Sequence, residues 1–230
     1  MFSDKMTLRM SSLLCPIMAF GILSCDNAKE KAAPTDLFTA RSETRSILLT
    51  ASDSKSRWRA MRILAALSAQ DAIPDIIGFL KSEFPLERAN AARALGDLKA
   101  SSATQHLLET LQREKDNEVI QQTSLALRML KVKSAIELLK IRIADVSDEQ
   151  TKVWLLQAIV EIGGSAEISY TASFLEDSSQ FMRRCAAESL GCLSGVDFGF
   201  PKNGGPFSPE PSIARARKWW NMNKQKWAQR

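Results

Sequence analysis

The sequence predicts an all-α fold, an α-solenoid of about five helical hairpins with a capping helix at each end. Two observations lead to this prediction. A pattern of apolar residues with helical spacing recurs every 31 or 32 residues, and no segment alternates apolar and polar residues as a half-buried strand would. Hydrophobic residues make up 45% of the 230 and charged residues 25%, which is an ordinary composition for a globular protein.

Residues 1–35 predict an export signal and a tether that lie outside the solenoid. Lys5 and Arg9 precede an uncharged run over residues 11–24. As a helix this run spans about 21 Å, too little for a bilayer core of about 30 Å. A basic start followed by a short apolar segment is typical of a signal peptide. The small and polar residues 26–35 then favour a flexible tether.

The apolar run ends in Ile-Leu-Ser-Cys at residues 22–25, which resembles the lipobox of bacterial lipoproteins. The resemblance implies a lipid on Cys25 and a membrane-anchored protein of the bacterial cell envelope that faces the periplasm or the exterior. The alternative is an ordinary cleaved signal in which Cys25 is incidental. We therefore expect a signal peptide over residues 1–24 and a lipidated cysteine with its tether over residues 25–35.

The remaining chain divides into a capping helix over residues 36–52 and a repeat domain over residues 53–230. In the cap, we expect apolar side chains to cover the open end of the first repeat, namely Leu37, Phe38, Ile47 and Leu48. Each repeat holds a four-residue segment whose first and last residues are Leu or Ile. An apolar or small residue lies one helical turn before the start of each segment. These segments span residues 64–67, 95–98, 127–130, 159–162 and 190–193.

The strings over residues 91–98 and 186–193 share the form Ala-x-x-x-Leu-Gly-x-Leu. They resemble the HEAT repeat, in particular the short bacterial kind that is also found in phycobilin lyases, and the resemblance covers about residues 53–193. It implies a structural ladder of basic residues that reach toward an acidic group of the neighbouring repeat. The matching residues are Arg57, Arg88, Lys152 and Arg183, while the third repeat has Ile120 in this place.

The C-terminal region departs from the repeat pattern. Residues 195–211 form a loop rich in glycine and proline, and residues 212–230 predict a helix with a charge of +6, which leaves −1 for the rest of the chain. Three roles are open for this helix: a terminal cap, which we favour, a membrane-surface contact, or single-strand nucleic-acid binding. Export argues against nucleic acid. The candidate partner or membrane contacts are Phe198, Phe200, Phe207, Trp219, Lys224 and Lys226.

No group of residues predicts an active site. His106 is the single histidine, which excludes any site that needs two, and no phosphate-binding loop or nucleophile elbow is present. Cys185 and Cys192 lie seven residues apart on one expected helix, or about 10.5 Å along its axis, too far for a disulfide, and both are expected in the core. We therefore expect no catalytic residue, no cofactor, no metal and no enzymatic activity.

These observations favour a non-catalytic, lipid-anchored scaffold that binds an unidentified protein or peptide on a concave face formed by the second helices. Two alternatives remain. One is an enzyme of the HEAT-like lyase or glycosylase type, and the other is a module that binds lipid or a polyanion through its C-terminal helix.

Overall fold

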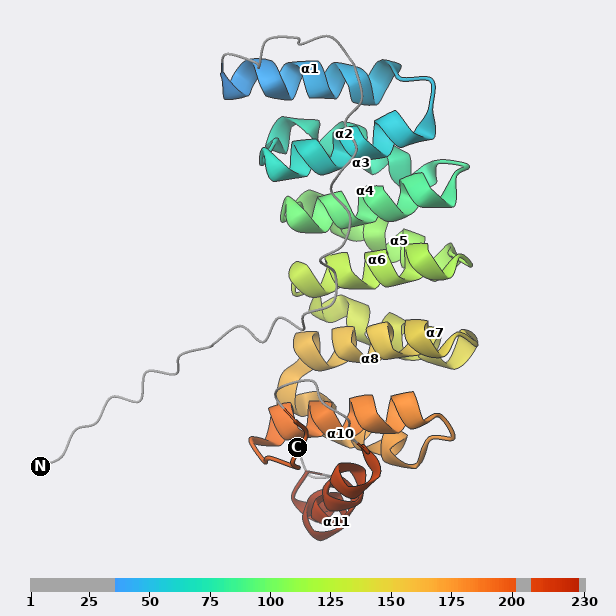
Figure 1. Ribbon diagram of the computed structural model, residues 1–230, viewed down its shortest axis with the longest axis vertical. Coiled ribbons are helices and arrows are strands. Elements are labelled where there is room, and N and C mark those ends of the chain that lie inside the picture. The colour runs from blue at the N-terminus through green and yellow to red at the C-terminus, as the bar shows by residue number, and fades with distance from the viewer. Residues whose placement is uncertain (1–35, 202–207, 228–230) are drawn as a thin grey trace, which may run out of the picture. The chain divides into compact units, whose positions relative to one another are not determined.

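The computed structural model describes residues 36–201 and 208–227. The expected signal peptide, Cys25, the tether and Phe207 lie outside the described residues. Within the described ranges all regular secondary structure is helical (Figure 1), which confirms the all-α prediction. Among these residues, none of the helices has the length and apolar character needed to cross a membrane.

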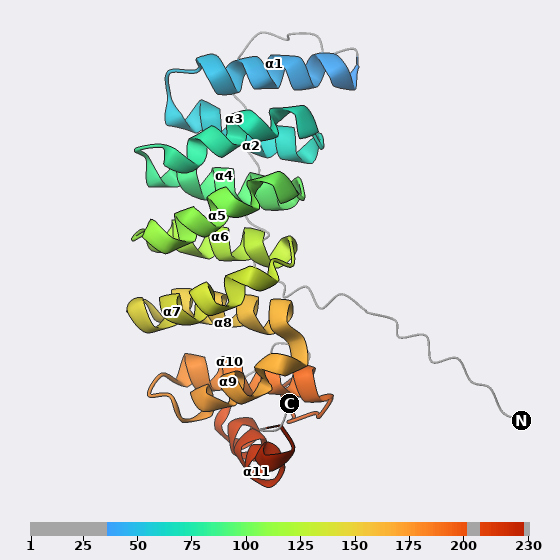
Figure 2. The ribbon, with the colours of Figure 1, turned by 180° about the vertical axis from the view of Figure 1, so that it is seen from behind.

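The helices follow one another in the chain order that the repeat predicts. Their bounds are α1 Leu37–Thr50, α2 Ser54–Ala66, α3 Ile73–Gly78, α4 Pro85–Asp97, α5 Thr104–Arg113, α6 Asn117–Met129, α7 Ile136–Asp145, α8 Glu149–Gly163, α9 Ile168–Ser173, α10 Gln180–Ser194 and α11 Glu210–Trp227. The first helices of the hairpins, α2, α4, α6, α8 and α10, stack in one layer, and the second helices α3, α5, α7 and α9 form the other (Figures 1 and 2). The solenoid is therefore two helices deep.

The start of each first helix is set by its own sequence. Asp53, Asp116 and Asp148 each accept a hydrogen bond from the backbone N–H three residues later, at 2.7 to 3.1 Å, and Ser179 caps α10 in the same way. α4 instead begins with Pro85, whose missing N–H costs nothing in a first turn. Equivalent starts give the repeats their common register.

The turn from first to second helix is built alike in three repeats. Ser68, Lys99 and Lys131 have φ values of 52°, 53° and 55°, in the left-handed region. The residue after each donates its backbone N–H to the carbonyl of the leucine that begins the four-residue apolar segment, as Ala69 does to Leu64 at 3.0 Å. These bonds satisfy carbonyl groups that a helix end leaves open.

The core lies between successive hairpins. The five stripe residues Leu64, Leu95, Leu127, Ile159 and Leu190 are all fully buried, so the 31- or 32-residue register is confirmed. Small residues let the first helices approach closely, and this is most evident at Gly96. A Cβ atom on Gly96 would lie 2.9 Å from the Cα of Ala126 in the next repeat.

The N-terminal cap α1 packs on α2 with a narrower surface than the sequence suggested. Thr44 and Leu48 are buried, but Leu37, Phe38 and Ile47 remain exposed, so the expectation that all four apolar side chains cover the first repeat was wrong. The reason is that polar side chains make the flanking contacts. Arg41 donates two hydrogen bonds to the Leu67 carbonyl, and Arg45 pairs with Asp75 on α3.

The C-terminal helix α11 takes the place of a second helix in the fifth hairpin. Ile213 and Ala216 are buried, and Trp220 and Trp227 pack against the core. Arg217 donates two hydrogen bonds to the carbonyl of Leu175, at 3.1 and 2.7 Å. The packing confirms the capping helix, which begins at Glu210, two residues earlier than expected.

The close approach at Gly96 yields a stability prediction. Gly96→Ala should lower the free energy of unfolding by about 1–3 kcal/mol, because the new methyl group meets backbone atoms that cannot move aside cheaply. Gly78→Ala is the matched control, since a Cβ there meets nothing within 4 Å. Urea unfolding followed by circular dichroism measures both variants. Equal midpoints would contradict the close packing of α4 on α6.

Candidate binding site at the repeat edge

Arginines form ion pairs along the edge where first helices begin. Arg57 and Arg88 reach the next repeat, and Arg183 reaches α11 within the fifth hairpin. The side chain of Arg57 pairs with Glu87 at 2.6 Å, Arg88 pairs with Glu114 at 2.7 Å, and Arg183 pairs with Glu210 at 2.8 Å. Lys152 is half-buried and makes no ion pair with any residue in the described ranges. Ile120 in the third repeat is buried in the core.

Each ladder arginine also binds the loop that precedes its helix. The Nη1 group of Arg57 donates to the carbonyl of Ala51 at 2.8 Å, and that of Arg88 donates to the carbonyl of Ser82 at 2.9 Å. Arg183 binds the carbonyls of Asp177 and Ser178 in the same way. Each guanidinium therefore satisfies loop carbonyls before its own helix and also holds a carboxylate, which for Arg57 and Arg88 belongs to the next repeat. This geometry suits the planar set of donors of arginine.

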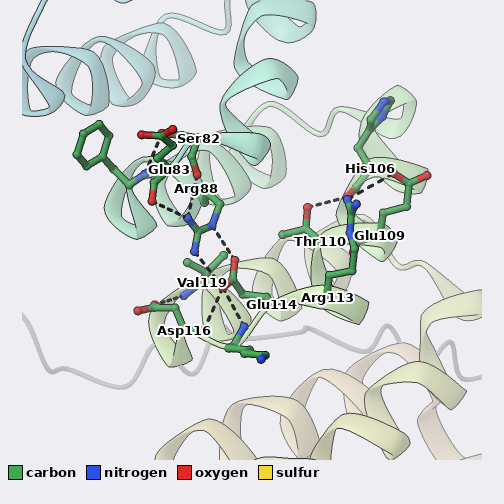
Figure 3. Close-up of polar contacts among 12 residues, drawn as sticks. Ser82, Glu83, Arg88, His106, Glu109, Thr110, Arg113, Glu114, Asp116 and Val119 are labelled. Carbon is green, nitrogen blue, oxygen red and sulfur yellow. Dashed lines mark hydrogen bonds and ion pairs between the residues drawn. The ribbon is translucent and has the colours of Figure 1, made fainter.

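A cavity of about 450 Å³ opens beside the Arg88–Glu114 pair. Its lining residues come from the first helix α4, the second helix α5 and the segments that follow α3 and α5: Leu80, Lys81, Arg88, Thr110, Arg113 and Glu114. A second cavity of about 480 Å³ also contacts Lys81 and is more apolar, with Leu49, Phe79 and Phe84 in its wall. We call the two cavities together the edge groove, and Figure 3 shows its polar half.

Glu114 is the most constrained charge in the edge groove. Its carboxylate accepts hydrogen bonds from Arg88 at 2.7 and 3.0 Å and from the backbone N–H groups of Lys115 and Asp116 at 2.9 and 3.0 Å (Figure 3). Burial by itself raises the pKa of Glu114, but these hydrogen bonds outweigh it and hold the pKa below its usual range. Glu114 is therefore an anion at neutral pH and cannot serve as a proton donor.

Two cations at the groove are not neutralised in this way. Lys81 is exposed and has no ion pair among the described residues. Arg113 is 68% exposed, and its only carboxylate contact within the described ranges is a 4.0 Å approach to Glu109. Both cations can accept an anionic group that enters the groove, while the apolar wall formed by Phe79 and Phe84 can hold the rest of a ligand.

The histidine and the cysteines do not complete a catalytic set. The ring of His106 points away from Glu114 (Figure 3), and its Nδ1 atom is buried without a hydrogen-bond partner. Cys185 and Cys192 are both free, so the expected absence of a disulfide between them is confirmed. Cys185 is buried, which raises the pKa of its thiol to about 12, but Cys192 is exposed, contrary to the expectation that both lie in the core. No group of His, Cys, Asp and Glu in the described ranges could hold a metal.

Within the described ranges, the aromatic residues proposed as partner or membrane contacts, Phe198, Phe200 and Trp219, pack against the protein's own core. Phe198 is only 3% exposed and packs edge-to-face on Trp219, with 5.9 Å between ring centroids. Phe200 is half-buried against the same core. They fill the space between α10 and α11, and Arg215 fixes this segment by donating to the Phe198 carbonyl at 2.8 Å. Of the candidates in the described ranges, only Lys224 and Lys226 are exposed.

Sequence reasoning missed the edge groove. Glu114 follows the polar end of a helix and resembles an ordinary solvated acid, and Lys81 and Arg113 resemble solvated bases. The available signal was the place of these residues: each lies within two residues of the junction between one hairpin and the next, where the ladder arginines act.

The Glu114 carboxylate predicts a pH effect on stability. Because the pKa of Glu114 is lower in the folded protein than in the unfolded chain, its ionised carboxylate stabilises the fold. This stabilisation is fully present above the unfolded pKa of about 4.5 and is lost as pH falls through the folded pKa. Glu114→Gln should lower stability at pH 7 by about 1–3 kcal/mol and should reduce the loss of stability between neutral pH and pH 3. Urea unfolding across this range tests it. Glu109→Gln is the control and should match the parent protein; a Glu114→Gln profile parallel to that of the parent would contradict the assignment.

Comparisons with known proteins agree with this architecture. Residues 42–128 match the family of HEAT repeats. No curated protein sequence matches the chain. Among solved structures, the complex of CpcE and CpcF of phycocyanin lyase from Nostoc sp. PCC7120 matches with a TM-score of 0.58 and 25% identity, over 77% of this chain and 70% of that one. A crystal structure of an engineered protein matches with a TM-score of 0.46 and 18% identity, over 80% of this chain and 88% of that one.

The phycocyanin lyase match corrects the expectation that this chain is not an enzyme, because the matched solenoid belongs to a lyase. That expectation rested on the absence of a known catalytic motif, and the similar structure shows that a chain of this architecture takes part in a lyase. Residues 42–128 thus match HEAT repeats, and the fold is an all-α solenoid similar to that of the matched lyase structure.

Proposed function

We propose that the protein acts as a subunit of a lyase-like complex, in which its solenoid binds a partner protein. The observation that carries this proposal is the similarity to the phycocyanin lyase complex over 77% of the chain. That lyase is described as a complex of CpcE and CpcF, which supports a function that is exercised with a partner chain rather than alone. HEAT repeats also present extended surfaces suited to binding other proteins.

The edge groove is the proposed contact for the partner. It joins an apolar wall, with Phe79 and Phe84, to two cations, Lys81 and Arg113. A ligand with an anionic group and an apolar body would fill both parts. Because Glu114 is ionised and tied to Arg88, its role in this proposal is to position that arginine and the loop and not to transfer a proton.

We further propose that a lipid anchor at Cys25 holds the protein at a membrane. The support is the lipobox-like end of a short uncharged run that follows two basic residues. A single acyl chain gives only marginal binding to a membrane, whereas several chains on one cysteine hold a protein stably. Anchoring would restrict the search for the partner to the membrane surface.

Photo-crosslinking tests the complex. A photoreactive amino acid placed at Lys81 in the full chain, in the bacterium that encodes it, should give one adduct of defined mass. The matched control is the same substitution at Lys133, an exposed lysine outside the edge groove. Arg113→Glu should reduce the Lys81 adduct at least fivefold. Absence of an adduct at Lys81, or equal adducts at both positions, would contradict binding at the groove.

The lyase-like activity has its own measurement. Once crosslinking has identified the partner, the partner is isolated from cells that contain the chain and from cells that lack it. The two samples are compared by mass spectrometry. A covalent change on the partner that requires the chain is the expected result. A partner of identical mass in both cells would leave the chain as a binding subunit and would refute the lyase-like part of the proposal.

Labelling with radioactive palmitate tests the anchor. The parent chain should carry label and sediment with membranes, and Cys25→Ser should lose both properties while its solenoid keeps the parent's melting temperature. Cys15→Ser is the control and should retain the label. Label that persists in Cys25→Ser would show that the resemblance to a lipobox is misleading.

A further inference from the structure

A second surface, on α2, lies outside the edge groove. Trp58, Arg59, Arg62, Ile63 and Ala66 line a cavity of about 490 Å³ on this helix. The guanidinium groups of Arg59 and Arg62 lie 5.8 and 5.5 Å from the centre of the Trp58 ring. Ile63 is 49% exposed beside them. We call this surface the α2 patch.

The arginines of the α2 patch lack the carboxylate partners that several arginines on other first helices have. On α4, Arg93 pairs with Asp97 at 3.0 Å; on α10, Arg184 pairs with Glu188 at 2.8 Å. Arg128 on α6 pairs with Glu161 on α8 at 2.9 Å. In the described ranges, neither of the two patch arginines forms an ion pair.

The repeat itself shows which group is missing. Arg62 and Arg93 occupy the same place in successive repeats, 31 residues apart, and the residue one turn later is Ala66 in the first repeat and Asp97 in the second. The exchange of an acid for alanine removes the internal partner and leaves a small, open space beside Arg62, which the cavity shows. A carboxylate supplied from outside could take the position that Asp97 fills in the neighbouring repeat.

We propose that the α2 patch binds an acidic peptide segment of a partner protein, with carboxylates on Arg59 and Arg62 and an apolar side chain on Trp58 and Ile63. Charge complementarity argues for this occupant, since two guanidiniums can hold carboxylates with two donors each. The exposed Ile63 and the Trp58 ring argue for an apolar residue within the acidic run. The inference does not depend on the lyase-like activity or on the edge groove.

Fluorescence anisotropy tests the proposal with the full chain and a labelled peptide of four glutamates around one leucine and one phenylalanine. The peptide should bind, and its affinity should fall as salt rises, because the contacts are exposed ion pairs. Arg62→Glu should weaken binding at least tenfold. Arg93→Glu, the matched change in the next repeat, should weaken it less than twofold, because Arg93 is already paired.

A second variant separates the missing carboxylate from net charge. Ala66→Asp supplies the acid that the second repeat has at Asp97, so it should weaken peptide binding about tenfold. Ala144→Asp adds the same charge at an exposed position on α7 and should have no effect. Thermal melts of all variants should match the parent.

Three results would overturn the proposal: no peptide binding, binding unaffected by Arg62→Glu, or equal weakening by the two aspartates. A single-stranded oligonucleotide of the same charge that binds tighter than the peptide, with the same dependence on Arg62, would assign the patch to nucleic acid and would also overturn it.

Discussion

The stacking of apolar stripes between neighbouring hairpins is the constraint on which the rest of this protein depends. A single hairpin of α4 and α5 would expose apolar side chains such as Leu95, which are buried when the hairpins on either side pack against it. Small residues on the first helices make this contact close, as at Gly96 and Ala126. That contact positions the ladder arginines, the edge groove and the capping helices α1 and α11, because none of them has an apolar core of its own.

The ladder arginines couple the polar edge to this core. Arg88 holds a carboxylate on the next repeat while it satisfies carbonyls of its own loop, so the loop cannot move independently of the stack. The edge groove lies beside the Arg88–Glu114 pair, and its exposed cations are attached to backbone that this pair holds in place. A ligand that binds Lys81 and Arg113 would therefore meet a preorganised surface, which reduces the entropy that binding costs.

The fold could be predicted from sequence because its signals are local and repeated. The helical spacing and the apolar stripe at Leu64, Leu95 and their equivalents repeat the same register in every hairpin, so one weak repeat does not obscure it. The sites could not be predicted in the same way. Glu114 and Phe198 carry no local signal of burial, because the neighbours that bury them belong to other hairpins or lie beyond a loop. The α2 patch is visible in sequence only after the repeats have been aligned on the structure.

The identical turns at Ser68, Lys99 and Lys131 have a consequence for how such a chain can change in length. Each of these three hairpins contains its own turn and apolar stripe and packs against neighbouring helices on either side. Gain or loss of one whole unit, at a multiple of the repeat length, would leave every remaining apolar stripe covered, while a shift of a few residues would uncover several. The gene can therefore lengthen or shorten the solenoid by duplication or deletion in whole-repeat steps, with the capping helices α1 and α11 retained.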